Sequence, residues 1–175
     1  GVNTYAYLSK IITFAVMPFT AVTQALSPIV GYNYGAGKPE RVKKTVRFCA
    51  MLSLGYALAA LTLIEAFPHA FLRVFTISPE ILSLGIGSLR ILAAALLFMP
   101  LPMLSGAAFQ AVGQKGWAFV MYASNLIFLI PAAFCMASRF GINGIWWAYV
   151  VANIGASLLA LFKMRMVKAP PIPKG

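Results

Sequence analysis

Five long apolar stretches dominate this sequence, at about residues 11–34, 46–67, 81–112, 117–138 and 143–166. A helix that crosses a bilayer needs about 20 mainly apolar residues, and each stretch reaches that length. Composition agrees, because 61% of the residues are hydrophobic and 10% are charged, which is too little polar surface for a soluble domain. The sequence therefore predicts an all-α, polytopic transmembrane helical bundle with five spanning helices.

The third stretch, residues 81–112, is longer than a bilayer requires. At ~1.5 Å per residue it would reach ~48 Å, against ~30 Å for the hydrocarbon core. It must therefore tilt, kink at Pro100 and Pro102, or begin in the interface. Arg90 favours an interfacial start, with the true span nearer residues 91–112, because a charge within the core is costly.

Glycines follow the end of the first apolar stretch. Gly35 and Gly37 follow the first one and suit a left-handed cap at a helix C-terminus. We expect Gly35 to hold the positive φ that other residues resist.

The basic residues divide unevenly between the two sides that five spans define. Ten Lys and Arg fall in the connection 35–47, the turn at Lys115 and the C-terminal segment, and three fall on the other side: Lys10, Arg73 and Arg139. Since cytoplasmic loops are enriched in such residues, we expect a cytoplasmic C-terminus and an external Gly1. The expected location is the plasma (inner) membrane of a bacterium, with lipid as a partner and at least one further helix upstream.

We expect residues 1–168 to form one unit and the proline-rich residues 169–175 to be a disordered cytoplasmic tail. The chain has 3 acidic residues, all Glu, and a single histidine, His69. Cys49 and Cys135 lie inside apolar stretches, where a thiol usually packs as a small hydrophobe. No catalytic residues, metal site or cofactor are predicted, and we do not expect an enzyme. Nucleic-acid binding is not expected either, because a basic nucleic-acid binder has far fewer long apolar runs.

Three strings carry a family resemblance. They are Gln24–Ala36 (QALSPIVGYNYGA), Gly106–Gly113 (GAAFQAVG), and Phe128–Pro131 (FLIP) followed by Phe140–Trp146 (FGINGIW). In this order and spacing they resemble the C-terminal part of a MATE transporter, of the multidrug and toxic compound extrusion family. Its eighth-helix ending matches the segment that holds the motif residues Pro28, Gly31, Asn33 and Gly35.

The resemblance implies that the five helices are the eighth to twelfth of twelve, an incomplete C-terminal lobe of a two-lobed transporter. Its partners would then be the N-terminal lobe and the seventh helix of the same protein. The implied function is secondary active transport: a cation-coupled antiporter, using Na⁺ or H⁺, that exports cationic or amphipathic drugs by alternating access. Such lobes enclose a site near the midplane of the membrane.

The sequence departs from the family pattern at two places. Sodium-coupled relatives tend to carry an Asp in the tenth helix, whereas residues 81–112 contain no carboxylate. Many relatives have an Arg where Ser124 stands and an Asp where Asn153 stands, and here both charges are replaced together. A lone buried charge is costly, so the loss of both charges together is what we expect if the Arg and the Asp of those relatives form an ion pair. We therefore expect the coupling ion to bind outside these 175 residues.

Four polar residues within the spans are candidates for a substrate cavity: Gln24, Gln110, Asn125 and Asn153. Hydrogen bonding between helices explains each of them equally well. Arg90 is interpreted as an anchor that reaches the interface, with a substrate contact as its alternative. Glu65 and His69 are interpreted as interfacial residues near the outer end of the second span, and a proton-accessible site is the alternative for Glu65.

Two other functions remain open from the sequence. One is a flippase for lipid-linked saccharides, from the same superfamily. Flippases of that kind tend to place several basic residues in the central cavity, and here, apart from Arg90, the predicted spans carry basic residues only at their ends. The other is a truncated membrane fragment that transports nothing.

Overall fold

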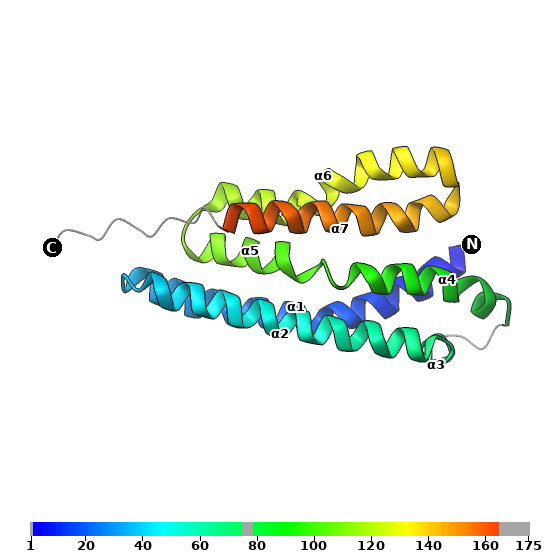
Figure 1. The fold of residues 1–175 in the computed structure, drawn as a ribbon, viewed down its shortest axis with the longest axis horizontal. Helices are drawn as coiled ribbons and strands as arrows, with labels where there is room; N and C mark the ends of the chain where they lie inside the picture. The colour runs from blue at the N-terminus through cyan, green and yellow to red at the C-terminus, as the bar shows by residue number, and fades with distance from the viewer. Residues whose placement is uncertain (1, 75–78, 165–175) are drawn as a thin grey trace.

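The computed structural model describes residues 2–74 and 79–164, and these residues form helices and short turns (Figure 1). The helices are α1 (Val2–Gly35), α2 (Pro39–Ala66), α3 (Pro68–Arg73), α4 (Pro79–Ala95), α5 (Pro100–Ala111), α6 (Lys115–Phe140) and α7 (Ile142–Met164). Five segments are long and apolar enough to cross a membrane: Leu8–Gly35, Pro39–Ala66, Gly85–Ala111, Lys115–Arg139 and Gly144–Met164. The prediction of an all-α bundle with five spanning helices is confirmed.

Two helices begin earlier than predicted. Helix α1 starts at Val2 rather than near residue 11, and α2 starts at Pro39 rather than near residue 46. The basic segment that was predicted as a connection is therefore the first turns of α2. Its chemistry suits a helix start, because Pro39 lacks an N–H that would be unpaired there and Glu40 faces the positive end of the helix dipole. The Glu40 carboxylate also pairs with Lys43 Nζ at 3.0 Å.

The first turn is closed by a Schellman motif, and its left-handed residue is Gly37. The N–H of Lys38 donates to the Asn33 carbonyl at 2.9 Å, and that of Gly37 donates to the Tyr34 carbonyl at 3.0 Å. Gly37 has φ 67°, whereas Gly35 is the last helical residue and is not among the positive-φ glycines. The prediction for Gly35 is therefore wrong, because the left-handed residue lies two positions beyond the last helical one.

The third predicted stretch is two helices. Helix α4 ends at Ala95 and α5 begins at Pro100, so the kink expected at Pro100 and Pro102 is a break just before Pro100. The other expectation, a span that starts near residue 91 with Arg90 in the interface, stays a prediction; the segment that is long and apolar enough to cross a membrane runs from Gly85 to Ala111 and includes Arg90. The short helix α3 was not predicted. The tail 169–175 lies outside the described residues.

The helices pack as a bundle in which the broken third span is central (Figure 1). Gly85–Ala111 is the most buried of the five candidate spans, and Lys115–Arg139 is the least buried. One apolar cluster joins α1, α2 and α4, with Phe19 packed edge-on against Tyr56 at 5.3 Å between ring centroids. A second cluster joins α1, α2 and α5 around Leu26 and Leu104. Helices α6 and α7 form an antiparallel hairpin on one side.

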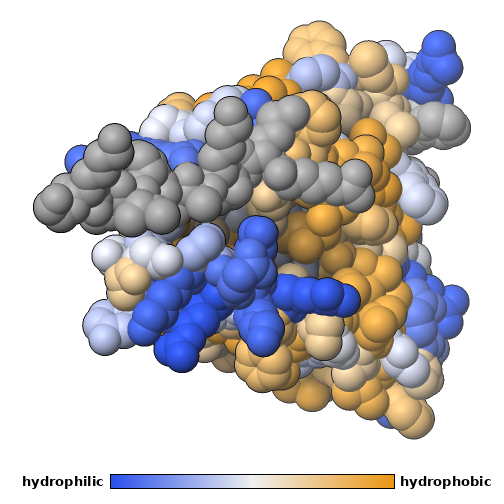
Figure 2. Space-filling view, turned by 60° about the vertical axis from the view of Figure 1, so that its left-hand side comes forward, coloured by the Kyte–Doolittle hydropathy of each residue, from blue (hydrophilic) through white to orange (hydrophobic). Residues whose placement is uncertain are grey.

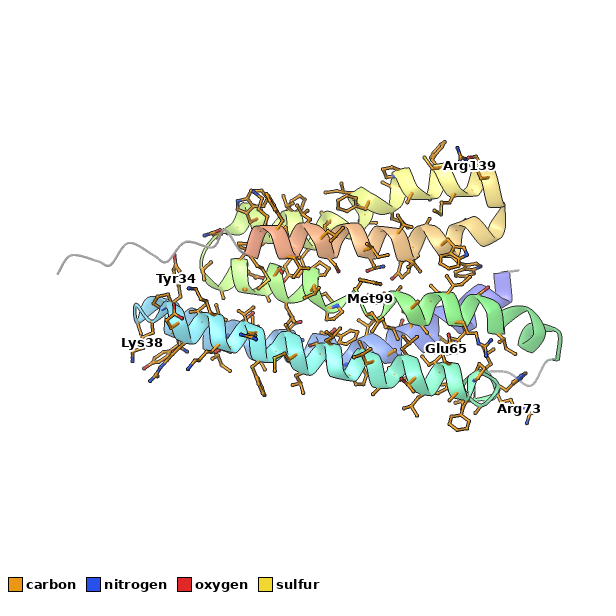
Figure 3. The ribbon with its side chains drawn as sticks, in the orientation of Figure 1. Tyr34, Lys38, Glu65, Arg73, Met99 and Arg139 are labelled. Carbon is orange, nitrogen blue, oxygen red and sulfur yellow. The ribbon has the colours of Figure 1, made fainter. Side chains whose placement is uncertain are left out.

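The turns collect at two ends of the bundle. The α1–α2 turn and the α5–α6 turn lie at one end with the end of α7, while α3 and the α6–α7 turn lie at the other (Figure 1). Figure 3 places Lys38 at the first end and Arg73 and Arg139 at the second. Figure 2 brings the first end forward and shows hydrophilic side chains gathered there beside the apolar flank of the bundle. Lys38 therefore lies at the opposite end of the fold from Arg73 and Arg139, in agreement with the predicted division.

Candidate functional site

The break in the third span leaves a backbone carbonyl that needs a donor. In an unbroken helix the Phe98 carbonyl would accept from the N–H of residue 102, but residue 102 is proline and has none. Ser157 of α7 fills this role, because its Oγ donates to the Phe98 carbonyl oxygen at 2.5 Å. Ser157 is 3% exposed, so water does not substitute for it. A hydrogen bond from α7 thus stabilises the backbone at the break between α4 and α5.

One aromatic side chain of α6, Tyr122, both packs on α5 and forms a hydrogen bond to it. A Cβ built on Gly106 would lie 2.9 Å from the ring of Tyr122, so the ring packs directly on the glycine. The Tyr122 hydroxyl reaches Gln110, one turn further along α5, and donates to its Oε1 at 3.4 Å. Gly106 and Gln110 belong to one of the strings that carry the family resemblance, and their spacing of four residues puts both on one face of α5.

The four predicted cavity residues are not brought together by any hydrogen bond among the described residues. Gln24 on α1 and Gln110 on α5 are exposed, Asn125 on α6 is half-buried and Asn153 on α7 is buried. Asn153 Nδ2 donates to the Tyr149 carbonyl of its own helix at 2.9 Å. Among these four residues, Gln110 is the one with a hydrogen bond to another described helix, accepted from Tyr122 of α6 at 3.4 Å.

Ser124 and Asn153, the two positions where the resemblance implies that charges have been lost, each form a hydrogen bond within their own helix. Ser124 is fully buried, and its Oγ donates to the Met121 carbonyl at 2.6 Å. Asn153 is 2% exposed and is bonded as described above. Both side chains therefore form hydrogen bonds within their own helices.

The family-motif residues lie near the end of α1. Gly31 approaches α5 closely, because a Cβ there would lie 3.6 Å from the Ala111 carbonyl oxygen. Asn33 is buried and its Nδ2 donates to the Ile29 carbonyl at 2.8 Å. Pro28 lies inside α1, and Gly35 is its last residue.

An ion pair that was not predicted from the sequence links α2 to α4. Arg90 Nε lies 3.1 Å from Glu65 Oε2, and both side chains are about half exposed. The two residues were interpreted separately, as an anchor and as an interfacial carboxylate. The sequence did carry a signal for this pair, because Glu65 lies near the end of the second predicted span and Arg90 near the start of the third, on the same side. Because each charge neutralises the other, neither is a lone charge on the bundle.

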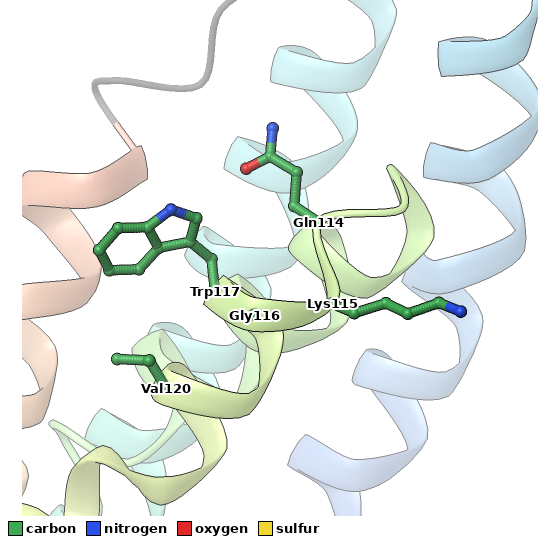
Figure 4. Close-up of a pocket in the computed structure, with 5 residues that line it drawn as sticks. All are labelled: Gln114, Lys115, Gly116, Trp117 and Val120. Carbon is green, nitrogen blue, oxygen red and sulfur yellow. The ribbon is translucent and has the colours of Figure 1, made fainter.

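A shallow pocket lies at the α5–α6 turn, on the basic end. It has a volume of about 540 Å³ and is lined by Gln114, Lys115, Gly116, Trp117 and Val120 (Figure 4). Lys163 of α7 places its Nζ 3.8 Å from the centre of the Trp117 ring, a cation–π contact that fixes the end of α7 against α6. None of the four predicted cavity residues lines this pocket.

The described residues hold no group of three or more His, Cys, Asp or Glu side chains that would bind a metal ion. His69 is exposed on α3, Cys49 is buried and Cys135 is exposed. The hydropathy, the length of the helices and the buried polar side chains that bond within the bundle define an integral membrane protein of the polytopic α-helical class.

Comparison with known proteins identifies the family. The family model MatE matches residues 1–135, so the chain belongs to the MatE family. The multidrug export protein MepA of Staphylococcus haemolyticus is 23% identical over 162 residues, which cover 93% of this chain and 36% of that protein. MepA of Staphylococcus aureus strain N315 is 26% identical over 169 residues, covering 95% of this chain and 36% of that one. The chain thus spans just over a third of the length of these relatives.

Solved structures agree on the fold. An outward-facing multidrug resistance MATE transporter of the MOP superfamily matches with a TM-score of 0.88 and 22% identity, covering 95% of this chain and 38% of that one. The MATE multidrug transporter DinF-BH, solved as a complex with a ligand, matches with a TM-score of 0.83 and 30% identity over 94% of this chain and 37% of its own. The five spans therefore form part of one lobe of this fold.

Proposed function

We propose that this chain supplies the eighth to twelfth helices of a secondary active transporter that exports cationic or amphipathic drugs by alternating access in exchange for Na⁺ or H⁺. Membership of the MatE family supports this proposal, as do relatives named for multidrug export. DinF-BH, a structural neighbour at 30% identity, is described as a multidrug transporter in complex with a ligand, which supports a small-molecule substrate. The remaining helices, including the N-terminal lobe, are the proposed partners.

The observation that carries the proposal is a polar stripe along the exposed side of α1. Thr13, Thr20 and Gln24 lie on one face of the helix with Met17, and all four are exposed within the candidate span Leu8–Gly35. Thr13 and Thr20 bond to their own helix, but a Gln24 carboxamide that faced lipid without a hydrogen-bond partner would be costly. This face therefore fits a water-filled cavity or the rest of the protein better than it fits hydrocarbon.

Gln24 is the side chain of this stripe best suited to meet a substrate. The two threonines donate to their own helix, Thr13 to the Ser9 carbonyl at 2.8 Å and Thr20 to the Val16 carbonyl at 3.5 Å. The carboxamide of Gln24 offers a donor and an acceptor at once. The exposed thioether of Met17 on the same face adapts to ligands of different shape.

Substrate protection of a cysteine at position 24 tests this proposal in the full-length protein. In a background with Cys49 and Cys135 replaced by alanine, Gln24→Cys should react with a water-soluble maleimide, and a lipophilic cation should slow the reaction. Ile29→Cys lies on a different exposed face of α1 and serves as the control, with no protection expected. Equal reaction rates at Gln24→Cys with and without the cation would contradict a substrate-facing stripe.

The coupling ion is proposed to bind in a part of the protein outside this chain. Glu40 is paired with Lys43, and Glu65 is paired with Arg90. A carboxylate that is already neutralised by a neighbouring cation is a poor site for Na⁺ or H⁺ exchange, because the neighbour competes with the ion. The same pairing of Arg90 weakens the flippase alternative, which needs basic residues that are available to a phosphate.

The proposed location is the bacterial plasma membrane, with the basic end and the C-terminus cytoplasmic. Lys38 lies at one end of the bundle (Figure 3), and Arg41 and Lys44 belong to the first turns of α2, which begins at Pro39; this basic end supports the orientation. Lys43→Cys should be labelled only from the cytoplasmic side, and Arg73→Cys only from outside. Labelling of both positions from one side would contradict the proposed orientation.

A further inference from the structure

Helix α2 runs along one edge of the bundle and has two opposite faces (Figure 1). One face packs against α1, α4 and α5, and its buried residues recur at helical spacing from Val42 to Ile64. The opposite face is exposed, with basic residues in its first turns and large apolar residues in the turns that follow. We call it the outer face of α2, and it consists of Arg41, Lys44, Arg47, Phe48, Met51 and Leu58.

The apolar part of the outer face is suited to contact with lipid. Phe48 is 63% exposed, Met51 is 60% exposed and Leu58 is 50% exposed. Thr62 lies one turn beyond Leu58, and its hydroxyl donates to the Leu58 carbonyl at 2.8 Å, so it needs no water. This surface therefore differs from the polar stripe of α1, where Gln24 presents an amide to its surroundings.

The length of α2 places its cations at the level of the headgroups. From Phe48 to Ala66 the helix is about 28 Å long at ~1.5 Å per residue, which matches the ~30 Å hydrocarbon core. With Phe48 at the edge of the core, Lys44 lies about 6 Å beyond it, within a headgroup layer about 5–8 Å thick. Arg47 lies at the boundary itself. Helical side chains lean toward the N-terminus, so both cations extend toward the headgroups.

Lys44 and Arg47 can hold the same anion. They are exposed and three residues apart, which makes them neighbours on the surface of a helix. Among the described residues neither forms an ion pair, because Glu40, on the same side of α2, pairs with Lys43 at 3.0 Å. Their charge therefore complements the phosphate of an anionic headgroup.

We propose that the outer face of α2 binds an anionic phospholipid, whose headgroup phosphate is held by Lys44 and Arg47 and whose acyl chain lies along Phe48 and Met51. Arg41, one turn further from the core, adds to the attraction. A phospholipid joins an anion to an apolar chain at the boundary where this face changes from basic to apolar. The site does not depend on the proposed export activity, since none of its residues belongs to the polar stripe of α1.

Quenching of a fluorophore by brominated lipid tests which molecule covers the outer face. In the full-length protein with its other cysteines replaced, Met51→Cys carries a bimane label and is reconstituted in phosphatidylcholine. Brominated phosphatidylglycerol or brominated phosphatidylcholine, with identical acyl chains, is added in increasing fraction. A basic residue near an anionic headgroup strengthens binding about fivefold, so half-maximal quenching should need an at least threefold lower fraction of phosphatidylglycerol. Equal fractions would overturn the proposal, and so would no quenching by either lipid, because a protein segment would then cover the face.

Two double variants separate the site from the general charge of this end of the bundle. Lys44→Gln with Arg47→Gln should abolish the preference for phosphatidylglycerol and leave quenching by phosphatidylcholine unchanged, which shows that the label at Met51 still faces lipid. Lys115→Gln with Lys163→Gln removes two charges from α6 and α7 at the same end and should keep the preference. Retention of the preference in the first variant, or equal loss in both, would overturn the proposal.

Discussion

Removing the Ser157 hydroxyl should destabilise the bundle at the break in its third span. In Ser157→Ala the Phe98 carbonyl loses the donor that replaces the missing N–H of Pro102. A buried carbonyl left without a partner costs about 1–3 kcal/mol in soluble proteins. Hydrogen bonds between membrane helices average about 0.6 kcal/mol with a maximum of about 1.7 kcal/mol, because the unfolded chain also finds partners. Since Ser157 is 3% exposed and water is excluded, we expect about 1–2 kcal/mol.

The assay is the midpoint of unfolding of the full-length protein in detergent, compared with a matched serine. Ser138→Ala is the control, because Ser138 is exposed and donates to Cys135 within its own helix at 2.9 Å. Ser157→Ala should lower the midpoint in proportion to its cost of about 1–2 kcal/mol, and Ser138→Ala should lower it by a clearly smaller amount. Equal shifts in the two variants would refute the role of Ser157.

A double variant tests the cause directly. Pro102→Ala restores an N–H four residues after Phe98, so Ser157→Ala should cost less in that background than in the wild type. Additive effects of the two substitutions would show that the Ser157 hydroxyl and the missing N–H of Pro102 do not serve the same carbonyl.

Three further outcomes are expected. Gly37→Val should reduce the amount of folded protein in the membrane more than Gly35→Val, because Gly37 has φ 67° and a β-branched residue resists that conformation; equal expression would contradict it. Gly106→Ala should lower the unfolding midpoint more than Gly55→Ala, since its Cβ would meet an aromatic ring at 2.9 Å while Gly55 has nothing within 4 Å. Glu65→Gln should retain at least half of the ion-driven efflux, and complete loss with normal expression and retained substrate binding would place the ion site here.

The spanning helices could be predicted from the sequence because length and hydropathy decide them. About 20 apolar residues have one stable conformation in a bilayer, so the five spans follow from the five runs. The start of α2 was misplaced because the turns after Pro39 are too basic to be predicted as part of a span, yet they still form helix. Hydropathy alone does not separate the end of a helix from the end of a span.

The contacts that organise the candidate site could not be predicted in the same way, because they join residues that are distant in sequence. Ser157 and Phe98 are 59 positions apart, and the local sequence around one does not indicate a contact with the other. Pro100 and Pro102 did indicate a kink, but they did not identify the donor that compensates for it. Glu65 and Arg90 lie on different helices, and their pairing depends on how α2 and α4 rotate about their own axes.

The most direct test of the proposed function is transport by the purified full-length protein in proteoliposomes. A fluorescent lipophilic cation is placed on one side, and a Na⁺ gradient or a pH gradient is imposed across the membrane. We predict that one of the two gradients drives the cation against its own concentration gradient, and that an ionophore that dissipates the imposed gradient abolishes this movement. Folded protein that moves the cation under neither gradient would contradict an ion-coupled exporter.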